Sequence, residues 1–109
     1  MELAFSSKTL RDICENIEKA EEEFGEQIAE ILKRRLADLR AAPCANDVVV
    51  GQPRVINGNP HSKICITLHD NCSIIISANH NDMPILEAGN VDWTKVTRIK
   101  INSIGREHE

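Results

Sequence analysis

The apolar residues change their period at Pro43, and this change constrains the fold more than any other feature of the sequence. Before Pro43 they recur at helical spacing, whereas beyond residue 62 they alternate as in β-strands. This order is typical of an α+β domain in which a helical hairpin packs on a later antiparallel sheet. The apolar opening at residues 3–5 predicts a first strand that joins this sheet from the other end of the chain.

Two helices are predicted before the proline. The first spans about 9–23, where Thr9 and Asp12 resemble a capping box. The second spans 24–41, because one apolar stripe continues through it until the proline blocks the helix. In the loop that follows, the three valines at 48–50 predict a short strand.

The second half of the chain is predicted to form strands. Residues 63–69 and 72–78 predict a β-hairpin, since apolar residues alternate in the first segment and three isoleucines fill the second. The isoleucine run predicts burial on both faces and therefore a central strand. A last strand is predicted over 96–104, with Arg98, Lys100 and Asn102 on one face. One face of the sheet is thus expected to be polar and partly basic.

The length and composition predict one cytoplasmic domain over residues 1–109. A chain of 109 residues is long enough for one hydrophobic core and too short for two. Its apolar runs are far shorter than the ~20 residues of a membrane span, and the residues after Met1 lack the basic start of a signal peptide. No membrane partner is expected. The four cysteines show no CxxC pair and are interpreted as reduced thiols.

The net charge of −4 is divided unevenly along the chain. Residues 1–30 hold three basic and nine acidic side chains, whereas residues 31–109 hold ten basic and eight acidic ones. Most of the acid falls on the first predicted helix, where a solvated outer face is the simplest interpretation. Residues 31–109 carry a small excess of positive charge, so they are able to form a basic strip on the surface despite the acidic pI of 5.6.

A metal site is considered because His61, Cys65, His69 and Cys72 are all zinc-ligand types. Residues four apart on a strand are ~13 Å apart, too far to meet at one ion with bonds of about 2.0 to 2.3 Å. The alternating isoleucines favour strand over helix in this region. The sequence therefore predicts neither a metal nor another cofactor.

Several separated stretches match a known family in the right order. They are residues 2–6, 10–15, 24–25 and 35–42, followed by Asn-Val-Asp-Trp-Thr-Lys-Val-Thr at 90–97. In these the chain resembles the HigB-like toxins of the RelE/ParE superfamily. The resemblance implies the RelE-like α+β fold, with an N-terminal strand and a two-helix hairpin on a small antiparallel sheet. It also implies a type II toxin-antitoxin system, in which the toxin cuts mRNA on the ribosome and a cognate antitoxin restrains it, with no DNA bound by the toxin itself.

The middle of the chain departs from this family. Related sequences read Glu-Leu-Lys-Gly-Asp-Arg before the hairpin and Tyr-Arg-Leu-Ile-Phe in its second strand. A plausible alignment places residues 55–60 and 72–76 there, so the Lys, both Arg and the Tyr are missing. The Asp-Tyr-His ending common in these toxins falls on 106–108, where only His108 is identical.

Metal-independent RNA cleavage needs a base for the ribose 2′-hydroxyl, an acid for the leaving oxygen and cations for the developing phosphate charge. His108 and Glu107 are the acid–base candidates, and Lys63 is the candidate catalytic cation. The RNA-binding candidates are the basic residues on or beside the polar strands: Arg54, Arg98, Lys100 and Arg106. For His108 the alternative interpretation is a solvated chain end, and for the strand cations it is a solvated sheet face.

Two hypotheses of different classes follow. The first is an active endoribonuclease toxin whose partners are the antitoxin, the ribosome and mRNA. The second is a catalytically degenerate relative that keeps the fold as a protein-binding module, either antitoxin-binding or immunity-type. The acidic first helix would suit docking to a basic surface. A toxin with another target, such as gyrase, is implied by the resemblance alone.

Overall fold

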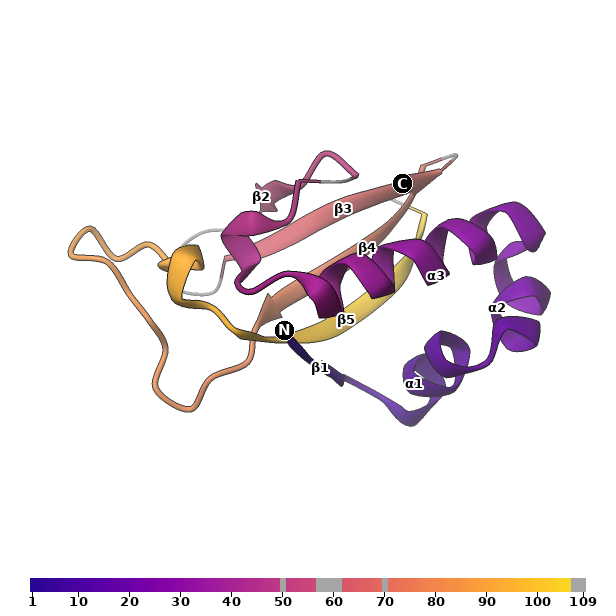
Figure 1. The fold of residues 1–109 in the computed structure, drawn as a ribbon, viewed down its shortest axis with the longest axis horizontal. Helices are drawn as coiled ribbons and strands as arrows, with labels where there is room; N and C mark the ends of the chain where they lie inside the picture. Colours follow the sequence, from indigo (N-terminus) through magenta and orange to yellow (C-terminus); the bar gives the residue numbers. More distant parts are fainter. Residues whose placement is uncertain (50, 57–61, 70, 107–109) are drawn as a thin grey trace.

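The computed structural model describes residues 1–49, 51–56, 62–69 and 71–106. Within these residues the protein is α+β, with three α-helices and a five-stranded mixed sheet (Figure 1). The helices are α1 (Lys8–Glu15), α2 (Ile17–Phe24) and α3 (Glu26–Ala41). The strands are β1 (Glu2–Phe5), β2 (Arg54–Ile56), β3 (Lys63–His69), β4 (Cys72–Ala78) and β5 (Arg98–Arg106), in the order β1-β5-β4-β3-β2.

The N-terminal strand joins the later sheet, as the sequence predicts. β1 pairs with β5 from Glu2↔Arg98 to Phe5↔Ile101, and the pairing is parallel. The predicted antiparallel sheet is therefore confirmed for β2 to β5, and the parallel pairing of β1 makes the whole sheet mixed. A hairpin imposes an antiparallel direction, whereas β1 continues into the helical layer and its direction is not fixed by a turn.

The β3–β4 hairpin is confirmed, and β4 lies at the centre of the sheet. Its residues Ile74 and Ile76 are 0% and 1% exposed and belong to the core between the sheet and α3. α3 crosses this face of the sheet (Figure 1) and contributes the buried leucines Leu32, Leu36 and Leu39. The alternation of β3 is also confirmed, since Ile64 and Ile66 are buried in the same core.

The single first helix predicted over 9–23 is wrong, because the chain leaves helical geometry at Asn16. Asn16 has φ −133° and ψ 107°, and its Oδ1 accepts a hydrogen bond from the backbone N–H of Glu18 at 3.0 Å. Asparagine side chains compete with the backbone in this way, so α1 ends and α2 begins at this residue. The helix also starts earlier than predicted, since Ser7 Oγ caps it by accepting from Leu10 N.

Two further boundaries differ from the prediction. The strand predicted at 48–50 is absent from its two described residues, Val48 and Val49. They follow the short 3₁₀ helix η1 (Ala45–Asp47) instead. Instead β2 forms after them and pairs with β3, although no alternating pattern predicted it. A strand forms where backbone meets a free sheet edge, and valine propensity alone does not decide this.

The last strand begins two residues later than predicted, after a second 3₁₀ helix, η2 (Trp93–Lys95). The loop between β4 and β5 extends beyond one end of the sheet (Figure 1). His80 ties this loop to the start of β5, because its Nε2 accepts from the backbone N–H groups of Thr97 and Arg98. Among the described helices, none has the length and apolarity that crossing a membrane requires.

Candidate nucleic-acid interface on the polar sheet face

The sheet face turned away from α3 carries polar and basic side chains, and we call it the polar face. In β3, β4 and β5, strand alternation puts polar residues on the face opposite the core-facing isoleucines of the same strands. Its cationic and hydrogen-bonding members include Arg54, Lys63, Thr67, Ser77, Lys100 and Asn102, with Arg98 at its edge.

Two lysines flank one serine across the three middle strands. Ser77 lies directly opposite Lys100 in the β4–β5 pair. In the β3–β4 pair, the register continues from Ile64↔Ile76 and places Lys63 opposite Ser77, on the side of Ser77 away from Lys100. Neighbouring strands are about 4.8 Å apart, so the two lysine backbones are separated by roughly 10 Å. Flexible ammonium groups at this separation are able to contact one phosphate from both sides.

A β-bulge adds an amide to this row. The β4–β5 register shifts between Ile75 and Ile76, which pair with Ser103 and Ile101 and leave Asn102 as the extra residue. Asn102 Nδ2 donates to Ser77 Oγ at 2.9 Å, which fixes the serine side chain between the lysines. The middle of the polar face thus combines positive charge with hydrogen-bonding groups. The charge comes from the half-buried Lys63 and Lys100, and the hydrogen-bonding groups from the Ser77–Asn102 pair.

Arg54 reaches from β2 across β3. Its guanidinium donates to Thr67 Oγ1 at 2.9 Å and to Cys65 Sγ at 3.1 Å. Its Nη1 also donates to the backbone carbonyl of Gln52 at 3.1 Å. The contact with Cys65, which is 3% exposed, shows that the guanidinium lies over a buried part of this face. Arg54 therefore adds positive charge here while serving as a bridge between two strands.

Arg98 lies at the β1 edge of the polar face and is already paired. Its Nε is 3.4 Å from Glu2 Oε1, and both side chains are exposed. An exposed pair of this kind contributes about 0–1 kcal/mol and exchanges readily with other ions. Arg98 is thus available to a phosphate only in competition with Glu2.

The remaining predicted site residues lie at the C-terminal end. Arg106 is the last residue of β5, and its backbone pairs with that of Cys72. Glu107 and His108 lie outside the described residues, so their predicted roles stay predictions. The structure brings Lys63, Lys100 and Arg54 onto one face, with Arg98 at its edge.

Sequence reasoning placed Asn102 on the polar face but assigned none of the neutral residues to the site. Ser77 and Asn102 are neighbours only because of the strand register and the bulge, and Thr67 matters through its contact with Arg54. Serine and asparagine on strands are common and carry no signal by themselves. The polar alternation of 98–102 was the one pattern that pointed to Asn102.

No family model, curated protein or solved structure matches this chain. The comparisons therefore assign no family. The polar face has to be interpreted from its own chemistry.

Proposed function

We propose that this chain is the toxin of a type II toxin-antitoxin system, with a RelE-like fold, and that it cleaves mRNA on the ribosome without a metal ion. The observation that carries the proposal is the row of Lys63, Ser77 and Lys100 on the polar face. Two cations around a hydroxyl suit a phosphodiester, whose negative charge is present in the substrate and grows during cleavage. The sequence resemblance to HigB-like toxins supports the same assignment.

In this proposal the lysines hold and neutralise the scissile phosphate. His108 and Glu107, which follow β5 in the sequence, take the proton from the ribose 2′-hydroxyl and deliver one to the leaving 5′ oxygen. Arg54 and Arg98 contact neighbouring phosphates, which fixes the register of the message without reading its bases. The ribosome presents the mRNA, and the cognate antitoxin restrains the toxin.

A second candidate is a catalytically degenerate protein that keeps this fold to bind an antitoxin or an immunity-type partner. The observation that favours it is that two of the predicted cations are already engaged within the fold. Arg54 donates to Thr67 and Cys65, and Arg98 pairs with Glu2. Cations held in this way contribute less to phosphate binding than free ones.

The experiment is induced expression in a bacterial host, with growth and the integrity of several messages as readouts. The wild-type chain is compared with His108→Ala, Lys100→Ala and the control Lys95→Ala. Lys95 is an exposed lysine in η2, outside the polar face. We expect growth arrest with cleaved messages for wild type and Lys95→Ala. Lys100→Ala should reduce the cleavage rate on purified ribosomes at least tenfold, and His108→Ala should abolish cleavage.

The outcomes separate the two candidates. If soluble wild-type protein leaves growth and messages intact, the ribonuclease assignment is wrong and the binding module takes its place. If the wild type cleaves and Lys100→Ala cleaves equally well, the polar face is not the site of cleavage.

A further inference from the structure

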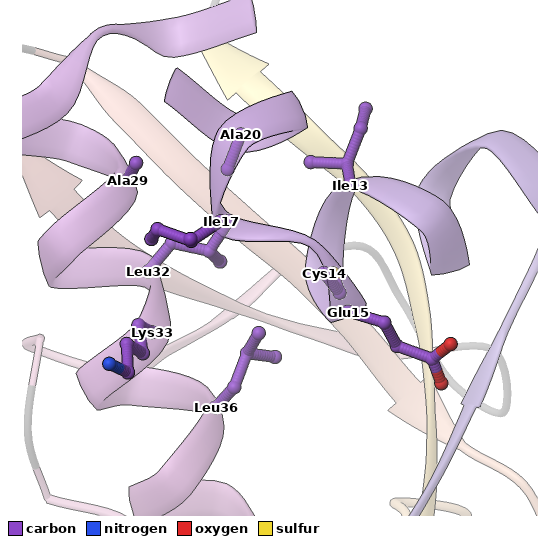
Figure 2. A pocket seen from close by; sticks show the side chains of 9 residues that line it. All are labelled: Ile13, Cys14, Glu15, Ile17, Ala20, Ala29, Leu32, Lys33 and Leu36. Atoms are coloured by element: carbon purple, nitrogen blue, oxygen red, sulfur yellow. The ribbon is translucent and has the colours of Figure 1, made fainter. Parts of the chain in front are cut away.

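A hollow of about 270 Å³ lies in the helical layer, between the α1–α2 corner and α3. Figure 2 shows Cys14 and Ile17 on one side of it and Leu32 and Leu36 on the other. The break at Asn16 produces this hollow, because two short helices meeting at an angle cannot cover α3 as one straight helix would. The hollow belongs to the helical layer, whereas the polar face lies on the other side of the sheet.

The lining is mostly apolar, and one large apolar side chain is left in solvent. Ile17 is 40% exposed, although it lies at the hollow beside the buried residues Leu32 and Leu36. Burying an isoleucine side chain contributes about 1.5–3 kcal/mol, so an exposed one beside an apolar hollow favours a partner. The two charged lining residues, Glu15 and Lys33, lie on opposite sides of the hollow in Figure 2.

The α2 side of this hollow is acidic. Residues 12–30 hold eight acidic side chains and one basic one, Lys19, which pairs with Asp12 at 3.8 Å. Within the described part of the chain, six of the acids take part in no ion pair: Glu15, Glu18, Glu21, Glu22, Glu23 and Glu26. A ligand of this region therefore meets a mostly apolar hollow with uncompensated negative charge on its α2 side and Lys33 on its α3 side.

We propose that the hollow between α1–α2 and α3 docks a basic amphipathic helix from a partner protein. Apolar side chains spaced three and four residues apart enter the hollow around Ile17, and the basic face of the partner meets the acidic surface of α2. The inference concerns a different surface from the proposed cleavage site, and it stands whether or not the polar face cleaves RNA.

The charge of this surface disfavours the other occupants. Nucleic acid and the anionic surface of a membrane carry the same sign of charge as α2 and are repelled by it. A second copy of this chain would bring an identical acidic surface to the contact in a symmetric pair. A helix suits the site better than a strand, because the hollow is formed by helices and contains no sheet edge.

The test uses a labelled synthetic peptide of about 15 residues, with leucine at positions i, i+3, i+4 and i+7 and arginine at most others. A second peptide has the same leucines with glutamate in place of arginine. Binding is measured by fluorescence anisotropy. We expect the basic peptide to bind at least tenfold more tightly than the acidic one and to bind more weakly as salt is added.

Two matched variants test the place of binding. Ile17→Asp should weaken binding of the basic peptide at least tenfold, although it adds negative charge, because it removes the apolar contact. Ile85→Asp is the control, since Ile85 is 42% exposed and belongs to the β4–β5 loop, outside the hollow. It should bind as the wild type does. Circular dichroism of both variants checks that they fold.

Cys14 provides a readout in the unaltered protein. Its thiol lines the hollow, whereas half-buried Cys44 does not. The basic peptide should slow alkylation of Cys14 at mildly alkaline pH and leave the rate at Cys44 unchanged, as followed by mass spectrometry. The proposal is overturned if the basic peptide fails to bind, if Ile17→Asp and Ile85→Asp bind it equally, if the acidic peptide binds as well, or if Cys14 is not protected.

Discussion

Gly51 occupies a position that no other residue can take without displacing its neighbours. Its φ is +75°, and its carbonyl oxygen accepts a hydrogen bond from the backbone N–H of Thr67 at 2.7 Å. A Cβ at this position would lie 2.5 Å from Ile66 Cγ2 and 2.8 Å from the carbonyl oxygen of Thr67. The backbone oxygen is held in the sheet and cannot move aside as a flexible side chain would.

We predict that Gly51→Ala lowers the free energy of unfolding by about 3 kcal/mol or more, from left-handed strain and overpacking together. Gly89→Ala is the control, because Gly89 has φ +95° with no atom within 4 Å of its would-be Cβ. It should cost only the strain, about 1 kcal/mol. Urea unfolding of the two variants measures the difference, and equal losses would show that crowding at Gly51 is not the cause.

The Cys14 thiol gives the protein a dependence of stability on alkaline pH. Burial raises the pKa of Cys14 to about 11 from its ordinary 9.0; the charge of Arg40 lowers it and that of Glu15 raises it. Because the folded protein holds the proton more tightly, this contribution is complete below about pH 9 and is lost as the pH rises towards 11.

We therefore expect the free energy of unfolding to fall between pH 9 and 11, and Cys14→Ser to remove part of that fall. Urea unfolding across this range measures both slopes. Other groups also titrate in this range, so the comparison of the two proteins is the informative quantity. Identical slopes would contradict the raised pKa.

Among the elements, the α1–α2 corner depends on Asn16. This residue ends α1 and caps α2 through its side-chain oxygen. The two short helices are marginal by themselves and are stabilised by packing and by their caps. Ser7 plays the same part at the start of α1.

Asn16→Ala should lower the free energy of unfolding by about 1 kcal/mol, because the N–H of Glu18 loses its acceptor. Asn16→Asp keeps an oxygen acceptor at the positive end of the α2 dipole and should leave stability close to that of the wild type. Thermal and urea unfolding of the pair test this. A loss of equal size in both variants would mean that the cap is not what Asn16 contributes.

At the scale of the whole molecule, β4 connects the two sides of the sheet. It pairs with β3 and β5, and its side chain Ile74 is fully buried against the helical layer. We expect Ile74→Ala to lower the free energy of unfolding by about 2–5 kcal/mol. The same deletion at the exposed Ile85 should cost less than about 1 kcal/mol. Comparable losses at the two sites would contradict the central position of β4.

The candidate site was only partly predictable. The alternation in β3 and β5 predicted that Lys63, Arg98 and Lys100 lie on the polar face. Successive side chains of a strand point to opposite faces, so this follows from the local sequence alone. Their grouping was not predictable, since strand register and the bulge at Asn102 join residues far apart in the chain. The hollow at Ile17 was missed because the helical period continues through Asn16 and conceals the break.

The sequence by itself determined α3, the β3–β4 hairpin and the buried face of each, because helical and strand periods are local properties that burial then reinforces. It also determined the acidic character of the first thirty residues. Only the tertiary structure decided the parallel pairing of β1 with β5, the formation of β2 and the alignment of Lys63, Ser77 and Lys100. Those features depend on which backbone edges meet after the chain collapses, and no short stretch of sequence encodes that meeting.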